Sequence, residues 1–199
     1  MAERRIRDPE RKARILAAAA RLGSRRGFHA ISMADIGAEA GIVGSGVYRH
    51  FDSKTAILVA MLDQVMDRLT ARTAEILAAG DDDAQTLCHL VRDHVEVALH
   101  HRDVLAVHHF ELHTLPEADR RRLRRNQRHY VEDWVHSLAP LRPDLADAEL
   151  RLAVHGALGA IQSTLFFHSG LPQDRLAELL EIMAHGCMGT IGERQLTNS

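Results

Sequence analysis

Apolar side chains recur every three or four residues along most of the chain, the spacing that places them on one face of an α-helix. The run through Ile15, Leu16, Ala19 and Leu22 is typical, and no segment shows the strict alternation of a half-buried β-strand. The pattern therefore predicts an all-α fold of about nine helices with short connections. These are expected near residues 9–26, 32–40, 44–50, 53–79, 83–100, 103–114, 116–138, 147–168 and 172–190.

The residues between these segments are of the types that begin and end helices. Asp8 stands before a proline, a pair that suits a first helical turn because proline lacks the amide hydrogen that would be unsatisfied there. Gly27 and Gly41 suit the left-handed backbone conformation that ends a helix. Ser32 and Asp35 have the spacing of a capping box, in which each side chain accepts the backbone N–H of the other residue. The first helices therefore have well-defined expected ends.

The composition favours a helical protein that does not cross a membrane. Hydrophobic residues make up 46% of the 199 residues and aromatic residues only 4%. No apolar run approaches the roughly 20 residues that span a bilayer, and the basic N-terminus lacks the apolar segment of a signal peptide. Cys88 and Cys187 form no CxxC motif and suit reduced thiols. We therefore expect a cytoplasmic protein with no membrane partner.

Charge is unevenly distributed along the chain. Residues 1–54 carry 11 Lys and Arg against 6 Asp and Glu, a net charge of +5. Residues 55–199 carry 14 against 21, a net charge of −7, and hold 12 of the 14 histidines. A basic segment joined to an acidic one favours a nucleic-acid-binding domain at 1–54 and a second helical domain at 55–199, although a net charge of +5 also fits an ordinary solvated face.

Two short helices joined by a tight glycine turn stand out between residues 31 and 54. In a helix-turn-helix motif this arrangement places the second helix in the major groove of DNA, which is about 12 Å wide. Four residues are spaced to pack the two helices together, namely Ile36, Ala40, Ile42 and Val47. Small or polar side chains are then left to face the DNA, namely Ser32, Ser45, Gly46, Tyr48, Arg49 and His50.

This segment resembles the TetR family of bacterial repressors, over about residues 10–60. The resemblance rests on Gly27-Phe28, Ser32-x-x-Asp35-Ile36, Ala40-Gly41-Ile42 and Gly46-Val47-Tyr48-Arg49-His50-Phe51-x-Ser53-Lys54. It implies a ligand-responsive transcriptional regulator, a repressor that binds double-stranded operator DNA as a homodimer and is released by a small-molecule effector.

The resemblance also implies two groups of DNA contacts. Phosphates would be contacted by Ser32, Tyr48, His50 and Lys54. Bases would lie nearest Ser45, Gly46 and Arg49. Phe51 is expected in the core. The N-terminal Arg4, Arg5 and Arg7 form either a minor-groove arm or unstructured charge.

In the TetR family the second domain binds the effector, so the resemblance implies a ligand site within residues 55–199. Apolar residues with scattered polar neighbours suit such a site. Our candidates are Phe110, His113, Arg124, Arg125, Arg128, Tyr130, Trp134, Gln162 and Phe166. For each of them, packing in an ordinary core is the alternative.

The arginine run at residues 120–128 is unexpected in an acidic domain. It is either a solvated face paired with nearby acids or a grip for an anionic ligand, such as the phosphates of a coenzyme A thioester. Arg125-Asn126-Gln127-Arg128 ahead of Trp134 is similar to TetR relatives that sense acyl-CoA in lipid or sterol breakdown. The two expected effector classes are therefore an acyl-CoA thioester and a neutral hydrophobic molecule.

Other classes of protein are less consistent with the motifs. His109 and His113 are spaced to share a metal ion, which leaves a metal-responsive regulator as an alternative, but this spacing is weakly specific and we predict no metal site and no cofactor. Motifs of the G-x-S-x-G, P-loop and G-x-G-x-x-G types are missing, so an enzyme is not expected. A helical adaptor would not need the residues from Tyr48 to Lys54.

The last two expected helices suit dimerisation, because small residues let helix backbones approach closely. Two such helices from each subunit would form a four-helix interface. The candidates are Gly156, Gly159, Ile161, Leu180 and Met183. Packing of these residues within one subunit is the alternative.

Overall fold

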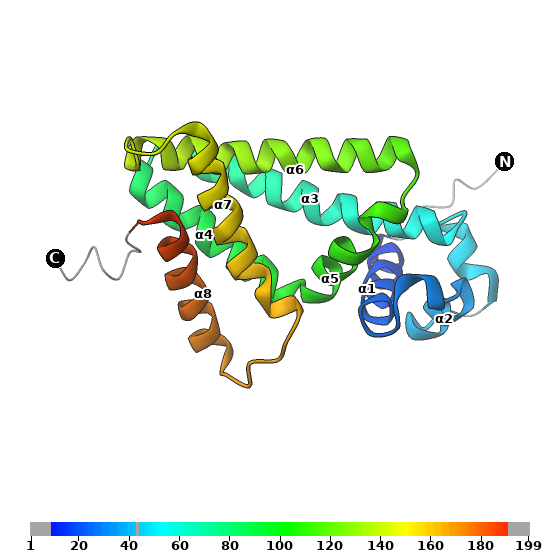
Figure 1. Ribbon diagram of the computed structural model, residues 1–199. Helices are drawn as coiled ribbons and strands as arrows, with labels where there is room; N and C mark the ends of the chain where they lie inside the picture. The colour runs from blue at the N-terminus through cyan, green and yellow to red at the C-terminus, as the bar shows by residue number, and fades with distance from the viewer. Residues whose placement is uncertain (1–8, 43, 191–199) are drawn as a thin grey trace. The chain divides into compact units, whose positions relative to one another are not determined.

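The computed structural model describes residues 9–42 and 44–190, and all regular structure in these residues is helical (Figure 1). Eight α-helices and five short 3-10 helices follow one another in this part of the chain. They are α1 (Pro9–Arg26), η1 (Phe28–Ala30), α2 (Met33–Glu39), η2 (Gly44–Arg49), α3 (Lys54–Ala78), α4 (Asp83–His100), α5 (Arg102–Glu111), η3 (Leu112–Thr114), α6 (Glu117–Leu138), η4 (Ala139–Leu141), α7 (Asp147–Gln162), η5 (Ser163–Leu165) and α8 (Gln173–Met188).

The all-α prediction is confirmed. The helices predicted at 103–114 and 147–168 end as α-helices at Glu111 and Gln162, where the 3-10 helices η3 and η5 follow. The predicted third helix differs in type. This segment, η2, is a 3-10 helix of six residues and not an α-helix. At its end the N–H of His50 donates to the carbonyl oxygen of Val47 at 2.9 Å, the 3-10 pattern, and the N–H of Phe51 donates to the same oxygen at 3.1 Å. The expectations for Asp8 and for Arg4, Arg5 and Arg7 lie outside the described residues.

The chain forms two compact units. The N-terminal unit combines Met1–Val65 with Asp103–Arg121, and the C-terminal unit combines Met66–Arg102 with Arg122–Ser199. Helices α3 and α6 each contribute residues to both units. The predicted functional boundary after residue 54 stays a prediction, because compactness does not locate a function.

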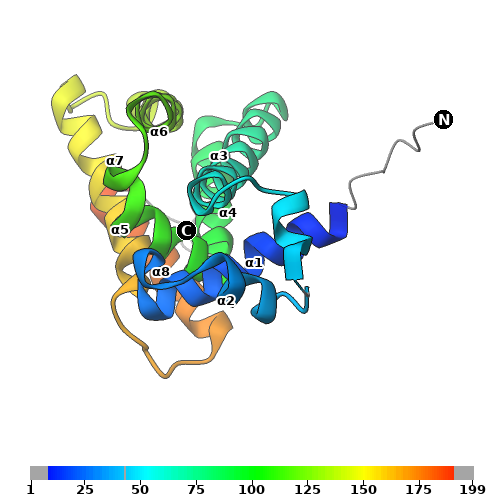
Figure 2. The ribbon, with the colours of Figure 1, turned by 90° about the vertical axis from the view of Figure 1, so that its right-hand side faces the viewer.

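In the N-terminal unit α1 lies beside α2, as Figures 1 and 2 show. Ile15, Phe28, Ile36 and Val47 are almost completely buried and form the centre of this unit. Burial of each such side chain contributes about 1.5–3 kcal/mol. The predicted capping box at the start of α2 is confirmed, because Asp35 Oδ2 accepts the N–H of Ser32 at 2.7 Å and Ser32 Oγ accepts the N–H of Asp35 at 3.1 Å.

Helix α5 completes the N-terminal unit, although it lies far along the chain. The buried Glu111 accepts the N–H of Phe28 at 3.2 Å, and its second oxygen lies 3.1 Å from Nε2 of His29. Ser24 donates to Asp103 at 2.6 Å. The burial of Glu111 is compensated by these partners, as a buried carboxylate requires.

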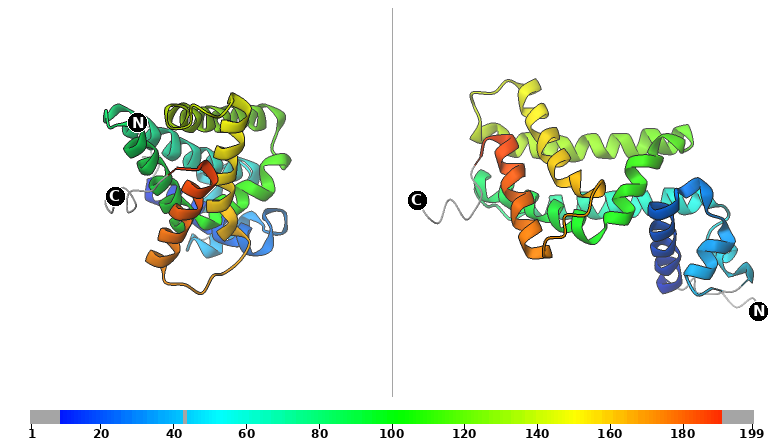
Figure 3. Two further views of the ribbon diagram at one scale, coloured as in Figure 1. Left: turned by 60° about the vertical axis from the view of Figure 1, so that its left-hand side comes forward. Right: turned by 60° about the horizontal axis from the view of Figure 1, so that its bottom comes forward.

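In the C-terminal unit α7 and α8 lie side by side, and α4 packs against both (Figure 3). The unit buries Leu90, Trp134, Leu138 and Ile161 almost completely. Asp82 caps α4, because its carboxylate accepts the N–H of Gln85 at 2.8 Å. None of the helices in the described residues has the length and apolarity needed to span a bilayer.

Candidate functional site

The turn between α2 and η2 has a geometry that only small residues permit. Gly41 has φ of +67°, and the N–H of Ile42 donates to the carbonyl oxygen of Gly37 at 2.8 Å. A Cβ atom on Gly37 would lie 3.1 Å from the carbonyl oxygen of Ile42 and 3.1 Å from Val47 Cγ2. A Cβ atom on Gly46 would collide with Ile42. The glycines therefore hold η2 close to α2.

This turn leaves the predicted DNA-facing side chains of η2 in solvent. Tyr48 is 57% exposed, Ser45 and Arg49 are exposed, and His50 is half-buried. The buried Val47 and Phe51 anchor the same segment to the core, and for Phe51 this agrees with the prediction. A short anchored segment thus presents an aromatic hydroxyl and a guanidinium group outward.

Two of the predicted phosphate contacts have partners within the protein. The Ser32 hydroxyl lies 2.5 Å from the Asp35 carboxylate, and these hydrogen bonds lower the pKa of Asp35. Lys54 Nζ donates to the carbonyl oxygens of His29 at 2.9 Å and Ile31 at 2.8 Å. An ammonium group has three hydrogen atoms, so Lys54 keeps one for a phosphate. The roles of Ser32 and Lys54 in DNA binding stay predictions.

A hollow of about 210 Å³ opens between α1 and η2. Its lining residues are Arg11, Arg14, Gly41, Ile42, Ser45, Gly46 and Arg49. Ser45, Gly46 and Arg49 were predicted to lie nearest DNA bases, whereas Arg11 and Arg14 were not predicted as functional residues. Their spacing of three along one helix was the signal that they share a face.

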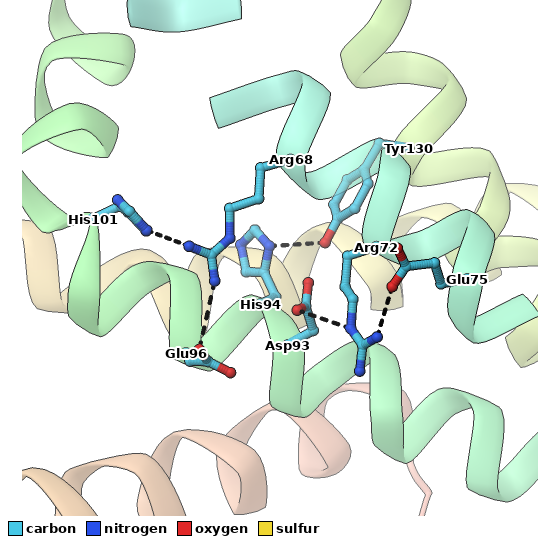
Figure 4. A network of polar contacts seen from close by, with 8 residues as sticks. All are labelled: Arg68, Arg72, Glu75, Asp93, His94, Glu96, His101 and Tyr130. Atoms are coloured by element: carbon cyan, nitrogen blue, oxygen red, sulfur yellow. Dashed lines mark hydrogen bonds and ion pairs between the residues drawn. The ribbon is translucent and has the colours of Figure 1, made fainter. Parts of the chain in front are cut away.

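A buried polar cluster in the C-terminal unit brings together three of the predicted effector residues. His94 Nδ1 lies 2.9 Å from the Tyr130 hydroxyl, and His94 Nε2 lies 3.5 Å from Gln162 Nε2. The ring of Trp134 stands edge-on to that of His94 at 5.9 Å, and Trp134 Nε1 is buried with no hydrogen-bond partner among the described residues. Figure 4 shows His94 and Tyr130 pointing toward each other between their helices. Prediction from sequence missed His94, because one histidine among fourteen has no distinguishing spacing.

Burial controls the ionisation of this cluster. His94 is fully desolvated, which lowers its pKa from 6.5 to about 4, so the imidazole is neutral at pH 7. Burial raises the pKa of Tyr130. The cluster is therefore a set of neutral donors and acceptors in an apolar environment, and it suits a neutral polar group of a ligand.

The other predicted effector residues are spread over the chain. Arg124, Arg125 and Arg128 are exposed on α6, and Phe166 is 59% exposed beyond α7. The remaining two candidates, Phe110 and His113, belong to the N-terminal unit and are exposed. Effector binding at all nine candidates stays a prediction.

Beside the buried cluster, ion pairs join α3 to α4 (Figure 4). Arg72 lies 2.8 Å from Glu75 and 3.7 Å from Asp93, whose pKa is raised by burial. Arg68 contacts both His101 and Glu96. These contacts hold α3 against α4, the helix that carries His94.

The predicted dimerisation residues divide into exposed and buried ones. Gly156, Gly159 and Met183 are exposed, and a Cβ atom on Gly159 would meet no atom within 4 Å. Ile161 and Leu180 are almost completely buried within the C-terminal unit. The exposed residues lie on α7 and α8 together with Leu152, which is 73% exposed, and Ile182, which is 52% exposed. Within the described residues, α7 and α8 therefore present an uncovered apolar surface.

The described histidines do not form a metal cluster. No group of three or more His, Cys, Asp or Glu side chains in residues 9–42 and 44–190 is arranged to hold an ion. His109 contacts the ring of Phe110 edge-on at 5.0 Å. The metal-responsive alternative thus gains no support from the described part of the chain.

Family models match two parts of this chain. The model described as bacterial regulatory proteins, tetR family, matches residues 15–61, which include α2 and η2. The model described as tetracyclin repressor-like, C-terminal domain, matches residues 80–165.

Individual proteins are similar over shorter or more divergent stretches. The HTH-type transcriptional repressor KstR2 of Rhodococcus jostii is 33% identical over 110 residues, which cover 55% of this chain and 54% of that protein. The match thus spans about half the length of that relative. A TetR-family transcriptional regulator from Bordetella parapertussis has a crystal structure that is similar with a TM-score of 0.78 and 27% identity, over 87% of this chain and 93% of that chain. The crystal structure of AibR in complex with isovaleryl coenzyme A and operator DNA has a TM-score of 0.73 over 87% of this chain and 97% of that chain; its 20% identity shows a shared fold.

Proposed function

The chain belongs to the TetR family of bacterial transcriptional regulators, and from this premise we propose that it is a repressor that binds operator DNA as a homodimer and is released by a small-molecule effector. One observation carries the proposal. η2 follows a turn that requires glycine and exposes Tyr48 and Arg49 to solvent, while the buried Val47 and Phe51 anchor it to the core. This segment lies within the residues that the family model matches. Members of this family regulate transcription and are not enzymes.

In the proposed complex η2 enters the major groove. Arg49 reads a base edge, because its guanidinium fork matches the two acceptors of guanine. Tyr48, His50 and the remaining hydrogen of Lys54 contact phosphates, which fix the position of the protein without reading sequence. Dimerisation places two such segments on successive major grooves, about 34 Å apart.

Arg49→Ala is expected to relax the preference at one base position, at a cost of about 1–3 kcal/mol, because a bidentate guanine contact is lost. Tyr48→Phe is expected to weaken binding to all sequences equally. Fluorescence anisotropy titrations with DNA from upstream of the protein's own gene and with a scrambled duplex measure both effects.

Arg175→Ala is the matched control, since it removes an exposed arginine that pairs with Glu178 on α8. The control variant should bind like the wild type. Wild-type affinity in both the Arg49 and the Tyr48 variant would contradict the assignment of η2 as the DNA-reading segment.

We further propose that the effector binds in the C-terminal unit beside His94, Tyr130 and Trp134. The buried indole N–H of Trp134 and the neutral His94 supply hydrogen-bonding groups in an apolar environment, the usual make-up of a small-molecule site. Of the two effector classes, an acyl-CoA thioester has the support of the exposed arginines on α6 and of the AibR complex with isovaleryl coenzyme A. Its phosphates would contact Arg124, Arg125 or Arg128.

Titration calorimetry with CoA thioesters, free fatty acids and neutral hydrophobic molecules distinguishes the two effector classes. We expect the thioesters to bind and thereby to make the protein release DNA. The double variant Arg124→Gln/Arg125→Gln is expected to lower the affinity for the thioesters but not for the neutral hydrophobic molecules. To change the ratio of the DNA-binding conformation to the released conformation from 99:1 to 1:99, the effector must bind the released conformation more strongly by about 5.5 kcal/mol. If neutral hydrophobic molecules release the DNA and thioesters do not, Arg124, Arg125 and Arg128 belong to a solvated face and not to a ligand site.

A further inference from the structure

The C-terminal end of α8 is closed by a side chain from a distant part of the chain. A helix leaves its last four carbonyl oxygens without partners inside the helix, so these oxygens need donors from elsewhere. The N–H of Thr190 donates to the carbonyl oxygen of His185 at 3.0 Å. The carbonyl oxygen of Met188, the last residue of α8, accepts a hydrogen bond from Nη1 of Arg142 at 2.8 Å. The end of α8 therefore depends on a residue 46 positions earlier.

Asp144 holds the Arg142 side chain in the orientation that this bond requires. Arg142 Nε donates to Asp144 Oδ1 at 2.9 Å, and Nη2 donates to Oδ2 at 2.7 Å. Such two-fold pairing fixes the plane of the guanidinium group and leaves Nη1 for Met188. The hydrogen bonds from Arg142 also lower the pKa of Asp144, so its carboxylate is charged at pH 7. Arg142 and Asp144 thus form a clasp that ties the connection between α6 and α7 to the end of α8 (Figure 3).

Gly189 leaves the room that the clasp occupies. Its φ is +64°, the left-handed conformation that commonly follows the last residue of a helix. A Cβ atom on Gly189 would collide with Nη1 of Arg142. Any larger residue at this position would therefore displace the guanidinium group from the end of α8.

The end of α8 that the clasp closes also carries the exposed face of this helix. Ile182, Met183, Gly186 and Cys187 are exposed and lie within the last two turns. Their spacing places them on one side of the helix. Met188 is completely buried and fastens the same turns to the core. Fraying or tilting of these turns would therefore displace the surface that is available to a partner.

We propose that Arg142 and Asp144 are positioning residues for the homodimer, because they keep the last two turns of α8 helical and correctly directed for pairing with a second copy of the chain. The inference rests on the proposed function, which supplies the homodimer. Neither residue has to touch the partner, since both act through the end of α8. A surface that is ordered before binding loses less conformational entropy on association, so the clasp strengthens the dimer.

The test is the dissociation constant of the Arg142→Gln dimer, measured by analytical ultracentrifugation of the full chain over a dilution series. Glutamine cannot bond to Asp144 through two atoms and to Met188 through a third. Because a hydrogen bond from a charged group is lost at the end of each α8, the dissociation constant should rise at least about tenfold. Hydrogen exchange followed by mass spectrometry should show faster exchange of the amides of residues 184–190. Gly189→Ala attacks the clasp from its other side and should produce both effects.

Two milder variants keep the test informative if Arg142→Gln folds poorly. Asp144→Asn leaves Arg142 in place but replaces the charged acceptor by a neutral one, so a smaller rise in the dissociation constant is expected. Arg142→Lys keeps the charge and can still donate to Met188, but it lacks the planar fork that Asp144 holds. Its dissociation constant should lie between those of the wild type and Arg142→Gln.

Arg72→Gln is the matched control. It also removes an arginine of the C-terminal unit that pairs with carboxylates, but these belong to Glu75 on α3 and Asp93 on α4. The control should keep the wild-type dissociation constant and the wild-type exchange of the amides of residues 184–190.

Each outcome decides the proposal. Wild-type dissociation constants in Arg142→Gln and Gly189→Ala would show that the clasp only stabilises the helix end, and the homodimer would stand without it. An equal rise in Arg72→Gln would assign the effect to general destabilisation and would also overturn the proposal. A wild-type chain that stays monomeric at every concentration would contradict the proposed homodimer itself, and the positioning role would fail with it.

Discussion

Met183→Glu is expected to convert a dimer into monomers. Met183 is 48% exposed on α8, next to the exposed Ile182, and Gly159 and Leu152 are exposed on α7, which packs against α8. In a four-helix interface formed by these two helices, the new carboxylate would be buried without a partner. Such a charge costs several kcal/mol, and every 1.4 kcal/mol weakens association tenfold, so the dissociation constant should rise at least about 100-fold.

Light scattering after size-exclusion chromatography measures this change. Leu77→Glu is the control, because it places the same charge on another partly exposed apolar residue, on α3. This control should remain a dimer. A dimeric Met183→Glu protein would exclude this part of α8 from the interface, and a monomeric wild type would exclude the interface altogether.

Acid is expected to destabilise the folded chain through His94. The pKa of His94 is about 4 in the folded protein and near 6.5 in the unfolded chain, because folding removes its water. Between these two values the unfolded chain binds more protons, so the free energy of unfolding falls as the pH falls. The loss from this residue at pH 5 is about 2 kcal/mol. His108, whose pKa burial also lowers to about 4, acts in the same direction.

Urea unfolding at pH 7, 6 and 5, followed by the fluorescence of the single tryptophan, measures the loss. Trp134 is a local reporter, since its ring is 5.9 Å from that of His94. His94→Gln should be less stable at pH 7 but lose about 2 kcal/mol less than the wild type on going to pH 5. The exposed His155, changed to glutamine, should retain the wild-type pH dependence. An identical pH dependence in the His94 and His155 variants would mean that His94 is not the proton acceptor.

Local signals in the sequence predicted the helices and the turn of the DNA-binding segment. Ser32 and Asp35 form their capping box, and Gly41 has the positive φ, because both features depend on residues a few positions apart. The 3-10 form of η2 was not predictable, since it depends on how Val47 and Phe51 are held by the core. Hydrophobic spacing predicts which face is buried and not the exact hydrogen-bonding pattern.

Contacts between distant residues account for what the sequence did not predict. Lys54 bonds to carbonyl groups 23 and 25 positions earlier, and His94 meets Tyr130 across 36 positions. A carbonyl group carries no residue-specific signal, so its partner cannot be read from a motif. Likewise, Ile161 and Leu180 resemble interface residues in sequence, and their burial within one subunit follows from the packing of α7 against α8.

The position of α5 in the chain has a consequence for how the protein is made. Phe28 and His29 bond to Glu111, which lies 83 and 82 positions later respectively, and Ser24 bonds to Asp103. During synthesis on the ribosome, α1 and α2 emerge first but lack these partners until α3, α4 and α5 have followed. The nascent N-terminal unit therefore lacks the contacts of Phe28 and His29 with Glu111 while about 80 further residues are translated. This takes roughly 4–16 s at bacterial and eukaryotic rates of synthesis. A gene fragment that stops at residue 65 would keep the protein permanently in that unfinished state.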